Sequence, residues 1–276
     1  MAGLITRFAP SPTGPLHLGH AFSALTAWDL AKGGSFLLRI EDIDRPRCKP
    51  EHKAAILDDL RWLGLDWPAP VMCQSARMAH YAAALDQLAA MGLTYRCTCT
   101  RSDIRAALSA PQEGAPLIGP DGPVYPGTCR EAGHDTVDAA IRLDMRKALH
   151  QAGAFAFTET GPLYPGRHGP SDMTETVGDI VLARRDIGTS YHLSVVVDDA
   201  AQGITLVTRG TDLFEATPIH VLLQRLLGLP TPLYHHHRLI RDENGKRLAK
   251  RDDARALARY RAEGATPIDI RAMLGL

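Results

Sequence analysis

The chain has 276 residues, 45% of them hydrophobic, which is enough for one large or two modest domains with a real core. Lys+Arg and Asp+Glu both number 31, so net charge neither demands nor excludes a nucleic-acid partner. No basic-then-apolar leader opens the chain, and no apolar run approaches the roughly 20 residues of a membrane span, so we expect a soluble, cytoplasmic protein.

The N-terminal segment has the pattern of a strand, a turn and a helix. Residues 4–8 are apolar-rich, and a turn rich in Pro and Gly separates them from a helical pattern that begins at Leu18. A helix start exposes backbone N–H groups and the positive end of the dipole, which suit phosphate. His17 and His20 share one face there, and Gly19 permits close approach of a base or ribose. The alternative is two surface histidines beside a turn.

A second predicted strand, residues 36–40, runs into acids that include Glu41 and Asp44. Ligands bind at the carboxyl ends of strands in open α/β sheets, so these acids could face an ammonium group; a solvated turn is the alternative. Amphipathic helices are expected over residues 50–63 and 76–91. This alternation of strand and helix predicts a parallel sheet with right-handed crossovers.

Three of the five cysteines fall close together, at Cys97, Cys99 and Cys129. In a cytosolic chain this favours a metal or free thiols over disulfides. Zinc takes four ligands and favours thiolates, so three cysteines leave a site one ligand short. Tyr125, His134 or a water could complete it, and three unrelated thiols are the alternative. A closed zinc site would hold together a loop-rich segment with few apolar residues to bury.

The second half of the chain contains a further series of apolar runs. Short strands are expected at residues 140–143, 155–157, 179–186 and 204–208. The β-branched run from Tyr191 to Asp199 predicts a buried central strand. Its last two residues, Asp198 and Asp199, would be acids at the carboxyl end of a strand, where ligands bind; caps of a turn are the alternative. Arg209 is a candidate carboxylate ligand, because a guanidinium binds a carboxylate bidentately, and Arg7 is a second one. A surface ion pair is the alternative for Arg209.

The C-terminal part predicts a helix at residues 218–227. The three histidines 235–237 cannot share a helix face as metal ligands, and we expect them in a strand or loop near the nucleotide. A basic loop at 246–251, with Lys250, could close over phosphates, and a solvated basic turn is the alternative. Two short helices are expected last, at residues 253–263 and 267–274.

Several of these segments resemble one enzyme family. Ala-Pro-Ser-Pro-Thr-Gly-Pro-Leu-His-Leu-Gly-His, at 9–20, resembles the HIGH signature of class I aminoacyl-tRNA synthetases in its glutamate- and glutamine-specific form. Leu-Leu-Arg-Ile-Glu-Asp-Ile-Asp-Arg-Pro-Arg, Tyr-His-Leu-Ser-Val-Val-Val-Asp-Asp and Val-Thr-Arg-Gly-Thr-Asp-Leu resemble the glutamate-specific members. The basic loop resembles the KMSKS loop in degenerate form, with Arg247 for its first lysine and Ala249 for its serine.

This resemblance implies an α/β fold, namely a Rossmann-like, HUP-type parallel sheet with an inserted zinc-binding subdomain. It implies catalytic roles for His17, His20 and Lys250, which with Gly19 would bind ATP. It implies that glutamate is held by Arg7, Ser11, Glu41, Tyr191 and Arg209. The pattern Cys-x-Cys followed by Tyr-x-x-x-Cys resembles the zinc site of the short glutamyl-queuosine tRNA(Asp) synthetases, which implies the ligands Cys97, Cys99, Tyr125 and Cys129.

The resemblance also implies the reaction and the domain organisation. We expect activation of L-glutamate with ATP and Mg²⁺, without tRNA, and transfer to the queuosine base in the anticodon of tRNA(Asp) by a monomer with one structural Zn²⁺. The expected parts are residues 1–96 and 136–252 for the catalytic halves, 97–135 for the zinc segment, and 253–276 for terminal helices without an anticodon-binding domain. A truncated glutamyl-tRNA synthetase and an inactive tRNA- or nucleotide-binding paralogue are the alternatives.

Overall fold

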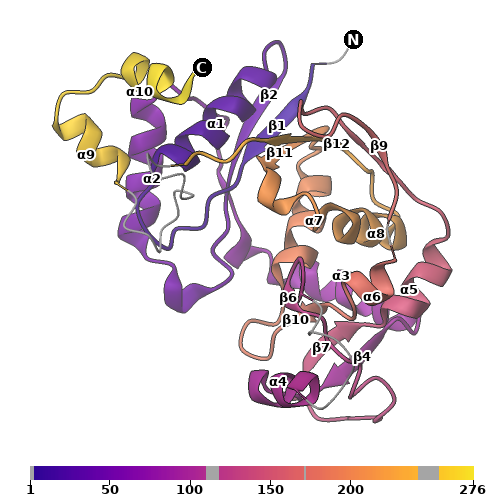
Figure 1. The fold of residues 1–276 in the computed structure, drawn as a ribbon. Coiled ribbons are helices and arrows are strands. Elements are labelled where there is room, and N and C mark those ends of the chain that lie inside the picture. Colours follow the sequence, from indigo (N-terminus) through magenta and orange to yellow (C-terminus); the bar gives the residue numbers. More distant parts are fainter. Residues whose placement is uncertain (1–2, 110–117, 171, 242–254) are drawn as a thin grey trace.

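The computed structural model describes residues 3–109, 118–170, 172–241 and 255–276. Its first sheet is parallel, with the order β1-β2-β3 (Figure 1). Strands and helices alternate here as β1 (Ile5–Phe8), α1 (Leu18–Leu30), β2 (Ser35–Ile40), η1 (Arg45–Arg47), α2 (Pro50–Trp62), β3 (Met72–Cys73), η2 (Gln74–Ala76) and α3 (Met78–Ala90). The predicted alternation and the parallel sheet are both confirmed.

A second sheet has the order β11-β12-β8-β9, and it is parallel except for the edge strand β9. Its strands and neighbouring helices are β8 (Phe157–Glu159), β9 (Gly166–His168), α7 (Tyr191–Ala201), β11 (Leu206–Gly210), η3 (Thr211–Leu213), α8 (Thr217–Leu227) and β12 (Leu233–His237). The Thr205 N–H donates a hydrogen bond to the Ile5 oxygen at 3.0 Å. The two sheets therefore lie side by side, with β1 next to β11.

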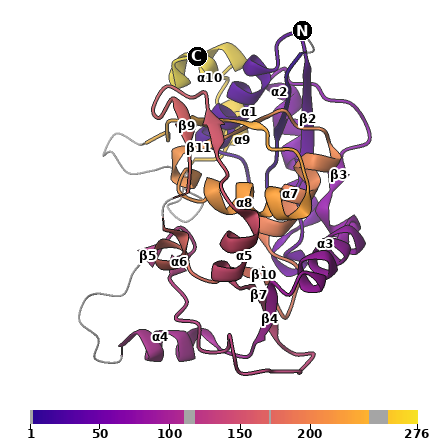
Figure 2. The same ribbon diagram turned by 90° about the vertical axis from the view of Figure 1, so that its right-hand side faces the viewer.

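A third sheet is antiparallel, with the order β10-β7-β4, and it carries the cysteine-containing segment. The elements here are β4 (Thr94–Cys97), α4 (Arg101–Ser109), β5 (Ile118–Gly119), β6 (Gly122–Pro123), β7 (Ala140–Leu143), α5 (Met145–Ala152), α6 (Met173–Thr176) and β10 (Val181–Ala183). Figures 1 and 2 place α4 at one end of the molecule and α9 (Leu257–Ala262) and α10 (Pro267–Leu274) at the opposite end.

Two large apolar clusters hold these layers together. One packs α1, α2 and α10 against β1 and β2, around residues such as Leu25, Ile56 and Ile270, each 0% exposed. The other packs α3, α5, α7 and α8, around residues such as Leu193 and Leu223. Burying each such side chain contributes about 1.5–3 kcal/mol. In the described ranges, no helix is long and apolar enough to cross a membrane.

The prediction of a strand at Tyr191–Asp199 is wrong, because this run forms helix α7. Ser190 caps the helix start by accepting a hydrogen bond from the Leu193 N–H. Seven of its eleven residues, polar as well as apolar, are buried and lie all round the helix, so the run shows no amphipathic period. A short apolar run of this kind looks the same in a buried strand and a buried helix. Asp198 and Asp199 therefore lie on the last turns of a helix, not at a strand end.

Candidate active site

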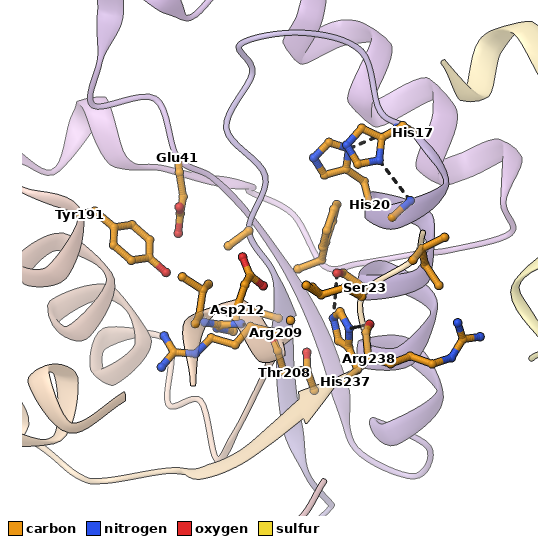
Figure 3. Close-up of a pocket in the computed structure, with 18 residues that line it drawn as sticks. His17, His20, Ser23, Glu41, Tyr191, Thr208, Arg209, Asp212, His237 and Arg238 are labelled. Carbon is orange, nitrogen blue, oxygen red and sulfur yellow. Dashed lines mark hydrogen bonds between the residues drawn. The ribbon is translucent and has the colours of Figure 1, made fainter. Parts of the chain in front are cut away.

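A cavity of about 390 Å³ opens where the carboxyl ends of β1, β11 and β12 meet the starts of α1 and α7. Seven of the predicted site residues line it together, namely Arg7, His17, Gly19, His20, Glu41, Tyr191 and Arg209. In Figure 3, Glu41 and Tyr191 lie on one side of this cavity and His17 and His20 on the other. The cavity is thus built at the edge where open α/β sheets bind ligands.

Backbone hydrogen bonds orient two histidine rings at the start of α1. The Gly19 N–H donates to His17 Nδ1 at 3.1 Å, and the His17 N–H donates to His20 Nδ1 at 3.2 Å. The two rings lie 3.8 Å apart between centroids. Because both Nδ1 atoms accept, each neutral ring carries its proton on Nε2. Each ring therefore offers an N–H donor beside the positive end of a helix dipole, which suits a phosphate.

Arg209 is held by three neutral side chains. Its Nε donates to His236 Nε2 at 3.1 Å, its Nη1 to His220 Nδ1 at 2.8 Å, and its Nη2 to Thr217 Oγ1 at 2.7 Å. Burial and the nearby Arg209 charge lower the pKa of His236 to about 4, and they lower the pKa of His220 well below its ordinary value. His236 in turn contacts Glu159 through Nδ1 at 2.5 Å.

In the part of the chain that the structure describes, Arg7 and Arg39, unlike Arg209, contact a carboxylate directly. Arg7 Nε lies 3.0 Å and Arg39 Nη1 2.6 Å from the same Asp199 oxygen. Burial alone would raise the pKa of Asp199, but the two guanidiniums lower it below its ordinary value. Among the described residues, Arg209 has no carboxylate partner in direct contact, so its positive charge is available to an anionic ligand.

Glu41 supplies the opposite charge in the same cavity. It follows β2 and accepts a hydrogen bond from Arg39 Nη2 at 3.2 Å. Burial raises its pKa despite the Arg39 charge, so it is a carboxylate that a cationic group would stabilise. The cavity therefore offers a cation at Arg209, an anion at Glu41 and phosphate donors at α1, a combination that fits an amino acid next to a nucleotide.

Two predicted site residues are not brought into this set. Ser11 is half-buried and is not among the lining residues. Lys250 lies outside the described residues.

The sequence reading missed several other residues at this cavity. Ser23 contacts His237 Nε2 at 2.8 Å, while His237 Nδ1 contacts the Arg238 oxygen at 2.9 Å. The prediction that residues 235–237 lie near the nucleotide could have led to these contacts. Side chains alternate along β12, so His236 points toward Arg209 and His237 toward α1.

The cysteine cluster forms as expected. The sulfurs of Cys97, Cys99 and Cys129 lie within 4.8 Å of one another, and the Tyr125 oxygen lies 3.4 Å from the Cys97 and Cys99 sulfurs. A Zn–S distance of about 2.3 Å gives tetrahedral ligand separations of roughly 3.8 Å, so this donor set fits zinc. His134 Nε2 lies 3.3 Å from Thr98 Oγ1 and also interacts with the Cys129 thiol, so it stays the alternative fourth ligand.

A second cavity, of about 1030 Å³, separates this cysteine cluster from the first cavity and shares Tyr191 with it. It carries charged groups of both signs. The guanidiniums belong to Arg101, Arg105, Arg142, Arg184 and Arg185, and the carboxylates to Asp44, Asp121, Asp179 and Asp186.

Comparison with known proteins places this geometry in one family. Residues 3–276 match the catalytic domain of class I tRNA synthetases (E and Q). A glutamyl-Q tRNA(Asp) synthetase from Rhodobacter capsulatus is 64% identical, over 99% of this chain and 100% of the relative. One from Nocardia farcinica is 45% identical, over 97% of this chain and 82% of the relative.

Solved structures agree with this fold. A glutamate-tRNA synthetase from Elizabethkingia anophelis matches with a TM-score of 0.76 and 27% identity, over 96% of this chain. This chain spans 59% of that longer protein. A Mycobacterium tuberculosis methionyl-tRNA synthetase, at 9% identity and a TM-score of 0.58, shares the fold alone. The predicted class I synthetase fold is confirmed.

Proposed function

The chain belongs to the class I tRNA synthetases of the glutamate and glutamine type, and on this premise we propose that it is a glutamyl-Q tRNA(Asp) synthetase. It is a ligase that forms glutamyl-adenylate from L-glutamate and ATP without tRNA. It then transfers the glutamyl group to the queuosine base in the anticodon of tRNA(Asp). The relatives at 64% and 45% identity, which bear that name, support this substrate over tRNA(Glu).

The observation that carries the proposal is that no carboxylate among the described residues contacts the Arg209 guanidinium directly. Its partners are neutral, whereas Arg7 and Arg39 share the carboxylate of Asp199. A buried cation with no carboxylate in direct contact is costly, and a substrate carboxylate lowers that cost. Arg209, with Tyr191 and Arg7 beside it, therefore binds the glutamate side chain, and Glu41 faces its ammonium group. Ser11 is assigned to this substrate by resemblance.

Adenylate formation uses the other side of the cavity. The α-carboxylate of glutamate attacks the α-phosphorus of ATP, and pyrophosphate leaves. The Nε2–H groups of His17 and His20, together with the start of α1, stabilise the charge that develops on the phosphate oxygens. Gly19 lets the nucleotide lie against the backbone. Lys250 is assigned by resemblance to the leaving pyrophosphate, and Mg²⁺ accompanies ATP.

The cysteine cluster serves a structural role in this proposal. Cys97, Cys99, Cys129 and Tyr125 hold one Zn²⁺, which when bound closes the loop-rich segment 97–135. This segment lies between the two catalytic halves, 1–96 and 136–252, and the short helices of 253–276 follow them.

The second cavity is the proposed entry of the tRNA. Its guanidiniums suit a phosphate backbone, and its shared wall at Tyr191 leads to the adenylate. A hydroxyl of the queuosine ring attacks the carbonyl of the mixed anhydride, and AMP leaves. We expect the protein to act as a monomer in the cytoplasm, where tRNA is found.

The test is transfer of labelled glutamate to three purified tRNAs. We expect label on tRNA(Asp) that contains queuosine, even after removal of its 3′-terminal adenosine, and none on unmodified tRNA(Asp) or on tRNA(Glu). Label on tRNA(Glu) that requires an intact 3′ end would instead identify a truncated glutamyl-tRNA synthetase.

A further inference from the structure

A chain of buried hydrogen bonds leads from Arg209 in the first cavity to Asp121 in the second. Arg209 Nη1 contacts His220 Nδ1 at 2.8 Å, and His220 Nε2 contacts His192 Nδ1 at 2.9 Å. His192 Nε2 then contacts Asp121 Oδ2 at 2.9 Å. His220 and His192 are 2% and 4% exposed, so water does not compete for the bond between them or for the bond to Arg209. They come from α8 and α7, and Asp121 comes from the turn between β5 and β6.

The donor and the acceptor in each of these hydrogen bonds are fixed by the two end residues, Arg209 and Asp121. A guanidinium can only donate, so His220 Nδ1 accepts and its proton lies on Nε2. His220 therefore donates to His192 Nδ1, which leaves the His192 proton on Nε2, where it is donated to the Asp121 carboxylate. Burial and the Arg209 charge lower the pKa of His220, which keeps that ring neutral, as this order requires. Every donor in the chain has one acceptor.

We propose that Asp121, His192 and His220 are positioning residues that hold the Arg209 guanidinium in the orientation that binds the glutamate carboxylate. The inference rests on the proposed function, because it gives a role to the supports of the group that binds substrate. Without the His192 Nδ1 acceptor, the proton on His220 Nε2 has no partner, and His220 can carry that proton on Nδ1 instead. An Nδ1–H would then point at an Arg209 N–H, and the guanidinium would turn away.

This arrangement ties glutamate binding to the segment that carries the cysteine cluster. Asp121 is the last residue in this series of hydrogen bonds. It lines the second cavity, and its side chain is 53% exposed. Its own pKa is lowered by the bond from His192, against the opposing effect of burial. The position of the β5–β6 turn therefore bears on the affinity for glutamate, although this turn does not line the first cavity.

The test measures glutamate-dependent ATP–pyrophosphate exchange in the full-length, zinc-loaded protein. His192→Phe keeps a ring of similar size but removes both bonds, and we expect the KM for glutamate to rise about tenfold, with kcat and the KM for ATP changed less than about twofold. His192→Asn restores an acceptor for His220 and should recover most of that loss. Asp121→Ala should raise the KM for glutamate about threefold, because water partly replaces the lost acceptor. His150→Phe, an exposed histidine on α5, is the matched control and should behave as wild type.

A second readout does not depend on activity. Nitrogen-15 spectra of the histidine rings, assigned with the His192→Asn variant, should show both His220 and His192 neutral and protonated at Nε2. An Nδ1–H tautomer at either ring would overturn the proposed order. An unchanged KM for glutamate in His192→Phe, or a loss that His192→Asn does not recover, would overturn the positioning role. Absence of exchange in the wild type would count against the proposed function instead.

Discussion

Replacing Asp199 with Asn tests the buried charge cluster beneath the first cavity. Asp199 Oδ1 accepts from Arg7 at 3.0 Å and from Arg39 at 2.6 Å, and these two arginines are 6% and 0% exposed. The substitution Asp199→Asn keeps the size of the side chain but removes its charge. It leaves two buried guanidiniums beside a neutral amide, whose NH₂ group cannot accept a hydrogen bond.

The expected effect is large. Removing one partner of a buried ion pair costs about 3–5 kcal/mol, because the remaining charge is left without compensation. Here two charges lose the same partner; Arg39 keeps Glu41 at 3.2 Å, but Arg7 is left with no carboxylate in direct contact among the described residues, so the upper part of that range applies. In a chain of this size 1 kcal/mol corresponds to about 2–4 °C in Tm, so we expect Tm to fall by roughly 8–20 °C.

Urea unfolding, followed by circular dichroism on the protein without substrates, measures this cost. The matched control is Asp186→Asn, because Asp186 lies 2.6 Å from Arg184 in an equally short pair but its side chain is 63% exposed. Exposed pairs contribute about 0–1 kcal/mol, so the control should change little. If Asp199→Asn unfolded within 1 kcal/mol of wild type, the assignment of Asp199 as the essential counter-ion would be refuted.

Two further predictions concern the metal and pH. Tyr125→Phe should lose zinc, measured by mass spectrometry of the purified protein, whereas His134→Ala should keep it, because the Tyr125 oxygen lies among the sulfurs; the reverse result would refute the tyrosine ligand. The free energy of unfolding should fall as pH drops from about 6.5 toward 4, since the pKa of His220 and of His236 is lowered by burial and only the unfolded chain takes up their protons in this range. Urea midpoints that stay constant between pH 6.5 and 4.5 would contradict this reading.

Local patterns were sufficient to predict much of the fold. The strand at 140–143 and the helix start at Leu18 are found where the sequence predicts them. His17 and His20 were predictable because they are neighbours on one helical turn. Glu41 follows a strand, and the carboxyl ends of such strands converge on one edge of a sheet.

The remaining features depend on contacts between distant segments. Asp198 and Asp199 look like ligand-binding acids in the sequence, but Asp198 accepts from Gln74, Arg77 and Tyr81, and Asp199 from Arg7 and Arg39. The side chains that hold Arg209, directly or through His220, come from segments that precede and follow it in the sequence. Neither the spacing nor the composition of these segments indicates that they meet. Without those partners, Arg209 cannot be distinguished from an arginine in an ordinary ion pair.

Glutamate-dependent ATP–pyrophosphate exchange without any tRNA tests the central claim most directly, with Lys250→Ala as the comparison. The account predicts robust exchange with L-glutamate, little with glutamine or aspartate, and loss of exchange in Lys250→Ala. Absence of exchange by the folded, zinc-loaded wild type would contradict it, and would leave either an enzyme that needs tRNA before it activates glutamate or a protein that only binds its ligands.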